Sequence, residues 1–241
     1  MASIAGAEGG GAARTERGRG GRRGDAKCCR GGARVCYNWP ESLGTPVSTI
    51  NRAAREINCK LVYYGPGLGG KTTNLQYIFG QVPEERRSQM LSLATEGDRT
   101  LFFDFLPLEL GDVRGYHTRF HLYTVPGQVF YTASRKLLLR NVDGVVFVAD
   151  SQEPRLDANL EALDDLEDNL REQKLELGKI PYVLQLNKQD LGNAVAVERL
   201  TAELRRYNEP VIPAVASNGT GVLETLRELS KSVLAQLAAG G

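Results

Sequence analysis

"GPGLGGKTT" at residues 65–73 decides the fold of this chain, because it matches the spacing G-x-x-x-x-G-K-[ST]. It follows an apolar stretch, 57–65, which we expect to be a strand. It precedes apolar residues at helical spacing over 75–82. A glycine-rich turn between strand and helix points backbone N–H groups and the positive end of the helix dipole at phosphate oxygens. The candidate phosphate-binding residues are Gly65, Gly67, Gly69, Gly70, Lys71, Thr72 and Thr73.

Two side chains of this loop have specific expected roles. Lys71 should reach the β- and γ-phosphates, and the Thr72 hydroxyl should bind Mg²⁺. The ordinary alternative is a glycine-rich turn that binds nothing. A complete match in the strand–helix context disfavours that alternative.

The rest of the chain from residue 57 alternates between strand and helix patterns, which predicts an α/β sandwich with a mainly parallel sheet. Two adjacent strands near 101–123 predict one antiparallel edge strand. The continuous apolar run 143–151 is typical of a strand covered on both faces. The expected strands are 57–65, 100–110, 117–125, 143–151, 181–190 and 210–217, and the expected helices 156–175, 197–207 and 222–237.

"NKQD" at residues 187–190 follows an expected strand, where ligands bind in open α/β sheets. Asp190 can accept two hydrogen bonds from N1–H and the amino group of guanine, and adenine has no such donor pair. Asn187 can contact the base edge and connect loops, while the stem of Lys188 can lie on the ring. This predicts GTP and GDP as ligands and disfavours a P-loop kinase or ATPase.

"TVPGQ" at residues 124–128 departs from the usual pattern of nucleotide-binding chains. Those chains place an aspartate at the first position to hold a magnesium-bound water, and this chain has Thr124. From the residues alone, Thr124 indicates a degraded site, a coincidence or a working variant.

From Val47 to Gly241 the sequence resembles the MglA family of Ras-like small GTPases, which act in bacterial polarity and gliding motility. The stretches that carry the resemblance are "REINCKLVYYGPGLGGKTTNLQ", "DRTLFFDFLP", "RFHLYTVPGQVFY", "GVVFVADS" and "NKQD". It implies a P-loop three-layer sandwich of the small-GTPase type and a slow GTPase that switches between GTP and GDP. Threonine replaces the usual aspartate in this family, so Thr124 is interpreted as a family trait. We expect it to weaken Mg²⁺ affinity while nucleotide binding is retained.

The resemblance also implies roles for residues outside the phosphate loop. Thr100 would bind Mg²⁺ and the γ-phosphate, and the N–H of Gly127 would sense the γ-phosphate. Gln128 would orient the attacking water, and Arg99 would act as an intrinsic catalytic arginine beside it. Ala216 would contact guanine through its backbone. Lys71 completes the expected catalytic set.

The family further implies partners: a homodimeric Roadblock/LC7-type activating protein, and effectors gathered at a cell pole. A second reading keeps nucleotide binding but not turnover, namely a nucleotide-gated binding scaffold with negligible hydrolysis. Thr124 is the feature that favours this second reading.

Composition limits the partners and the location that the sequence predicts. Apolar residues make up 41% and charged residues 24% of the 241 residues, and the formal net charge is +1. This predicts no strong attraction to nucleic acid or acidic membranes. No apolar run reaches the about 18 residues of a membrane span. The cysteine spacing matches no metal or disulfide pattern, so a cytoplasmic location is expected, with recruitment to a cell pole as an option.

Residues 1–46 differ from the rest, with eleven of the 27 glycines and eight basic against four acidic residues. Such a segment cannot bury enough apolar surface to order itself, so we expect it to be disordered. It is read as an RNA-contacting tail, a solubilising tail, or a segment absent from the native protein. The abrupt change of character at Val47 favours the third reading.

Overall fold

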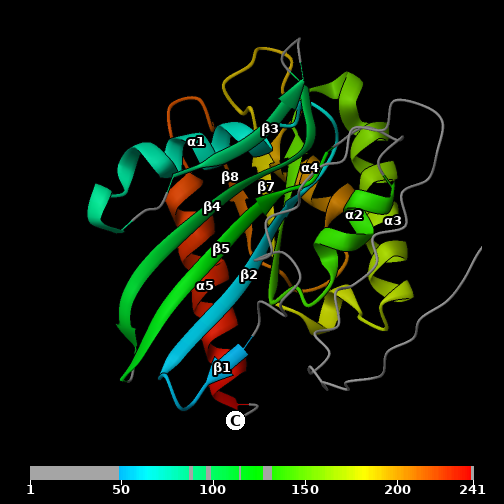
Figure 1. The fold of residues 1–241 in the computed structure, drawn as a ribbon. Coiled ribbons are helices and arrows are strands. Elements are labelled where there is room, and N and C mark those ends of the chain that lie inside the picture. Colours follow the sequence, from blue (N-terminus) through cyan, green and yellow to red (C-terminus); the bar gives the residue numbers. More distant parts are fainter. Residues whose placement is uncertain (1–48, 87–88, 96–98, 114, 127–131, 240–241) are drawn as a thin grey trace, which may run out of the picture. The chain divides into compact units, whose positions relative to one another are not determined.

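The computed structural model describes residues 49–86, 89–95, 99–113, 115–126 and 132–239, all within one compact unit of the chain, Pro40–Gly241. Five parallel strands, ending at β8 on one edge, form the larger part of a sheet that helices cover on both faces (Figure 1). In spatial order they are β5 (Tyr116–Thr124), β2 (Glu56–Tyr64), β6 (Gly144–Asp150), β7 (Tyr182–Asn187) and β8 (Val211–Pro213). The expected α/β class with a mainly parallel sheet is confirmed.

Three further strands pair antiparallel. β4 (Arg99–Val113) lies beside β5, as the adjacent strands near 101–123 predicted. It is not the edge of the sheet, because β3 (Leu91–Thr95) pairs with its outer side. β1 (Thr49–Asn51) pairs with the start of β2. Neither β1 nor β3 is predicted by the hydrophobic pattern.

Helices form two layers around the sheet (Figure 1). α1 (Lys71–Gln81) and α5 (Val222–Ala239) contribute to one buried cluster, and α2 (Thr132–Leu139), α3 (Leu156–Glu172) and α4 (Val197–Leu204) to the other. Three single-turn 3₁₀ helices span Glu84–Arg86, Glu153–Arg155 and Leu177–Lys179.

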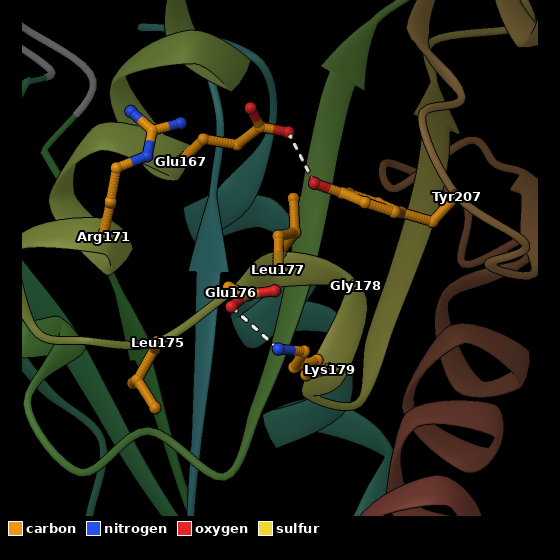
Figure 2. Close-up of a pocket in the computed structure, with 8 residues that line it drawn as sticks. All are labelled: Glu167, Arg171, Leu175, Glu176, Leu177, Gly178, Lys179 and Tyr207. Carbon is orange, nitrogen blue, oxygen red and sulfur yellow. Dashed lines mark hydrogen bonds and ion pairs between the residues drawn. The ribbon is translucent and has the colours of Figure 1, made fainter.

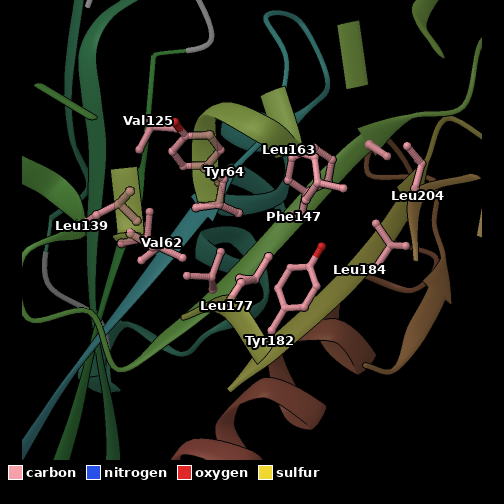
Figure 3. Packing of buried hydrophobic residues seen from close by; sticks show 14 of the residues in the cluster. Val62, Tyr64, Val125, Leu139, Phe147, Leu163, Leu177, Tyr182, Leu184 and Leu204 are labelled. Carbon is pink, nitrogen blue, oxygen red and sulfur yellow. The ribbon is translucent and has the colours of Figure 1, made fainter. Parts of the chain in front are cut away.

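The two buried clusters follow from the alternation of side chains along β2. Val62 and Tyr64 point toward α2 and α3, where they pack with Phe147 and Leu163 (Figure 3). Tyr63, between them, belongs to the opposite cluster beneath α1 and α5. Successive residues of a strand face opposite sides, so one strand contributes to both layers. Every residue of β6 is buried, as its continuous apolar run predicted.

Two helices end earlier than the sequence pattern indicates. α3 stops at Glu172 instead of 175, and Lys174 follows with φ 60°, a left-handed conformation that breaks the helix. α4 stops at Leu204 instead of 207, where the carboxylate of Glu209 accepts the backbone N–H groups of residues 206 and 207. In both cases a local turn outweighs the apolar periodicity.

The strands place the candidate site at one edge. Parallel strands end on the same side, so the loops after β2, β6, β7 and β8 meet there. α1 begins at Lys71, directly after the loop that follows β2. The dipole of α1 therefore has its positive end in this loop cluster.

Candidate nucleotide-binding site

The phosphate loop runs from Gly65 to Gly70, and its glycines are required by the structure. Gly65 has φ 137° and Gly70 has φ 97°, which L side chains rarely adopt. A Cβ at Gly65 would lie 2.3 Å from the carbonyl oxygen of Val148, and one at Gly70 would lie 2.1 Å from Nδ2 of Asn187. The loop is thus held closely against the ends of β6 and β7, with its backbone free to approach a ligand.

Lys71 curls back over this loop. Its Nζ donates hydrogen bonds to the carbonyl oxygens of Gly65 (2.9 Å) and Pro66 (2.6 Å). Burial lowers the pKa of Lys71 to about 7, and the Arg135 and Arg155 guanidiniums add to this lowering while Asp104 opposes it. The charge of a bound polyphosphate would stabilise the protonated form of this buried lysine.

Asn187 connects three loops at the end of β7. Its Nδ2 donates to the carbonyl oxygen of Gly69 at 2.8 Å. Its Oδ1 accepts the backbone N–H of Ala216 at 2.9 Å. That N–H is the group that the family resemblance assigns to guanine, so contact with a base would share or replace this bond.

The next residues of "NKQD" lie at the opening of the same edge. Lys188 has φ 69°, and its Nζ donates to Oδ2 of the buried Asp150 at 2.7 Å. Asp190 is exposed and has no hydrogen bond or ion pair with the part of the chain that the structure describes. Its carboxylate is available to a ligand approaching this edge.

Arg155 also reaches the phosphate loop, a contact that the sequence did not predict. Its Nη2 donates to the carbonyl oxygen of Gly67 at 2.8 Å, and its Nε lies 3.8 Å from Oδ2 of Asp150. The pair therefore connects the loop after β6 to the phosphate loop.

A second set of oxygens gathers at the start of α1. Thr72 donates from Oγ1 to Oδ2 of Asp104 at 2.6 Å, and Thr124 donates from Oγ1 to the same oxygen at 2.9 Å. Thr124 Oγ1 also accepts the backbone N–H of Asp104 at 2.8 Å. Hydroxyl and carboxylate oxygens are the donors that Mg²⁺ prefers, so this set fits the ion that small nucleotide-binding domains use.

Asp104 was not identified from the sequence. The available signal was a single carboxylate in the apolar stretch "LFFDFLPL" at residues 101–108, where a buried charge requires partners.

Only the backbone of Arg99 and Thr100 is described. Arg99 and Thr100 lie in the backbone of β4, opposite Thr95 and Ala94 of β3. Four residues of extended strand place Thr100 about 13 Å from Asp104 along β4. Gly127 and Gln128 lie outside the described residues.

Comparison with known proteins agrees with this geometry. Residues 100–233 match the model of the ADP-ribosylation factor (Arf) family. The chain is 61% identical over 195 residues to the mutual gliding-motility protein MglA of Myxococcus xanthus (strain DK1622). The aligned region covers 81% of this chain and all of that protein. The chain belongs to the MglA family of Ras-like small GTPases. It is therefore a guanine-nucleotide-binding protein of a class that hydrolyses GTP with Mg²⁺.

A separate hollow of about 450 Å³ lies away from the site of this MglA-family domain (Figure 2). Its residues lie at the end of α3, on the turn before β7 and after α4, toward the amino ends of the strands. Tyr207 donates to Glu167 at 3.2 Å, and Lys179 pairs with Glu176 at 2.8 Å. Arg171 pairs with Asp168 at 2.6 Å and Glu167 with Arg206 at 3.1 Å, so each charged side chain of the hollow has a protein partner and none assigns it a ligand. None of the helices in the described part of the chain has the length and apolarity needed to cross a bilayer.

Proposed function

We propose that this protein is a GTP-hydrolysing molecular switch that controls cell polarity and gliding motility by binding effectors in its GTP form. The observation that carries the proposal is the meeting of the phosphate loop and "NKQD" at one sheet edge, linked by the Asn187 bond to Gly69. The motility role rests on the 61% identity to a protein named for gliding motility.

Each loop has a distinct role in this proposal. Lys71 and the backbone N–H groups of the phosphate loop hold the phosphates, and Asp190 reads guanine. Thr72 holds Mg²⁺, which when bound neutralises charge on the phosphates. The contacts of Lys71 and Arg155 with the phosphate loop and the exposed Asp190 support this division of the site.

Hydrolysis is assigned to Arg99 and Gln128, acting with Lys71. Thr100 and Gly127 respond to the γ-phosphate in the same segments. The backbone of Arg99 and Thr100 is paired with β3, and in this proposal the start of β4 moves toward the phosphates when the switch closes. A homodimeric Roadblock/LC7-type activator that orders both segments accounts for a slow GTPase that accelerates on partner binding. Effectors at a cell pole would then recognise the GTP form.

The nucleotide released when the purified protein is denatured tests the binding step directly. We expect guanine nucleotides and no adenine nucleotides. Phosphate release over multiple turnovers, with and without the activator, then separates a switch from a scaffold that does not hydrolyse GTP. ATP that competes equally with GTP would contradict the proposal.

A further inference from the structure

Asp104 is a carboxylate in an unusual place, fully buried at 0% exposure on the face of β4 that also carries Leu106 and Leu108. A buried carboxylate is costly unless hydrogen bonds compensate for lost water. Here one oxygen, Oδ2, accepts from both the Thr72 and the Thr124 hydroxyls. The hydroxyl expected to hold Mg²⁺ and the threonine at the usual aspartate position thus meet at a single acidic atom.

The register of the sheet explains this meeting. Phe105 lies opposite Tyr123 in the antiparallel pair of β4 and β5, which places Asp104 opposite Thr124. The acid that nucleotide-binding chains usually carry on β5 is therefore present here on the neighbouring strand. The backbone N–H of Asp104 and its Oδ2 both bond the Thr124 hydroxyl, so Thr124 fixes the carboxylate in place.

We infer that Asp104 supplies the Mg²⁺ site with the negative charge that an aspartate at the position of Thr124 would supply, and that Thr124 positions it. The inference rests on the proposed nucleotide binding. Oδ2 lies 2.6 Å from Thr72 Oγ1, so a cation held by that hydroxyl has the carboxylate beside it. Mg²⁺ retains several of its waters in proteins, and a carboxylate accepts hydrogen bonds from them. The weak Mg²⁺ affinity expected from Thr124 alone does not follow, because the charge is present one strand away.

The test is the rate at which fluorescent GDP leaves the full-length protein as the free Mg²⁺ concentration is varied. In the natural protein, release should accelerate as Mg²⁺ is removed. In Asp104→Asn, which keeps the shape but loses the charge, the Mg²⁺ midpoint should move to at least about tenfold higher concentration. With excess chelator, release from the two proteins should be similar. Asp143→Asn is the matched control, because the Asp143 carboxylate also accepts a hydrogen bond, from the backbone N–H of Lys60, but lies at the other end of β6.

A charge exchange makes the test independent of how well the single variant folds. The double variant Asp104→Thr with Thr124→Asp returns the acid to β5 and places the hydroxyl on β4. Its Mg²⁺ midpoint should lie within a few fold of the natural protein, well below that of Asp104→Thr alone. Thr124→Ala, which removes only the positioning hydroxyl, should shift the midpoint by less than Asp104→Asn.

Different results would overturn the inference and the proposed function. An unchanged midpoint in Asp104→Asn would show that the carboxylate is only structural, and a lower midpoint would show that it obstructs the cation. A double variant as impaired as Asp104→Thr alone would also overturn the inference. Failure of the natural protein to bind GDP would refute the proposed function instead.

Discussion

At the scale of single residues, Lys71 and Asp190 hold different parts of the nucleotide, so their loss should have different effects. Lys71→Ala removes the phosphate-binding charge and should abolish binding of GTP, GDP and ATP alike. Asp190→Asn leaves the phosphate loop intact but loses the paired bonds to guanine. GTP affinity should then fall about a hundredfold or more while ATP affinity changes little. Calorimetric titration with the three nucleotides measures both. Normal GTP binding by Asp190→Asn with ATP still excluded would show that another residue reads the base.

The site depends on the absence of a side chain at Gly70. Gly70→Ala places a Cβ 2.1 Å from Nδ2 of Asn187 at a φ of 97°, so the Asn187 bond to Gly69 must break or the loop must move. GDP affinity should fall at least about tenfold, with a lower melting temperature. Gly80→Ala, in the same helix–loop unit with nothing within 4 Å of its Cβ, is the control. It should stabilise α1 by about 0.5–1 kcal/mol and leave GDP binding unchanged. Equal behaviour of the two variants would contradict the close packing of Gly70.

At the scale of elements, the register of β4 against β5 shows where sequence reasoning stops. The antiparallel pairing itself is predicted by the two adjacent apolar stretches near 101–123. The pairing shifts by one residue between Glu109 and Gly111. Counted back from the turn without that bulge, Asp104 would lie opposite Val125 instead of Thr124. A slip of one residue turns every side chain to the other face, so the meeting of Asp104 with Thr124 could not be derived from spacing.

Elements with a clear hydrophobic pattern, either periodic or continuous, could be predicted from the sequence, and elements without such a pattern could not. β6 is buried along its full length and reads as a continuous apolar run. α2 has eight residues and three consecutive leucines, of which Leu138 and Leu139 are buried and Leu137 is 40% exposed, so no helical period appears. Among the described strands, β3 pairs with β4 alone, at an outer position where no apolar run is required.

β5 carries both histidines of the chain, and His121 should lower stability in acid. Burial lowers the pKa of His121 to about 4, with Arg119 adding to the effect. Neutral His121 lies 3.1 Å from Oδ1 of Asn58 and stacks on Phe105. Because the folded pKa is below the usual 6.5, this group's contribution is complete above pH 6.5. It is lost as the pH falls toward 4, at a cost of up to about 3 kcal/mol.

His121→Gln should therefore flatten the loss of unfolding free energy between pH 6.5 and 4 in denaturant titrations. His117→Gln is the control, because His117 is more exposed, at 36%, beside Glu109. If both variants keep the natural pH dependence, the acid sensitivity arises elsewhere.

The start of β4 and the segment after β5 are the elements to which we assign catalysis. A positioned arginine accelerates phosphoryl transfer by roughly 10³ to 10⁵, and Arg99 directly precedes Thr100. Arg99→Ala and Gln128→Ala should each abolish activator-stimulated phosphate release while GTP affinity stays within a few fold. Arg52→Ala, an exposed arginine after β1, should keep full stimulation. Full stimulation of Arg99→Ala would instead indicate an arginine supplied by the activator.

At the scale of the whole molecule, the nucleotide would be held by the loops that follow four of the parallel strands. The phosphate loop, the loops after β6 and β7 and the last loop are already connected through Asn187, Arg155 and Asp150. Bound nucleotide should therefore stabilise the whole domain against unfolding. The free energy of unfolding should rise with the logarithm of the ratio of ligand concentration to its dissociation constant.

The last prediction concerns residues 1–46, which we propose are dispensable for this unit. β1 begins at Thr49 and pairs with β2, and a relative of 195 residues aligns over its full length with this chain. A chain shortened to Val47–Gly241 should match the full chain in GDP affinity within about twofold and in melting temperature within about 2 °C. Removing eight basic and four acidic residues changes the formal net charge from +1 to −3. RNA binding by the full chain that the shortened chain lacks would establish the tail as an RNA-contacting segment. A lower melting temperature or weaker GDP binding would show that the folded domain begins before Val47.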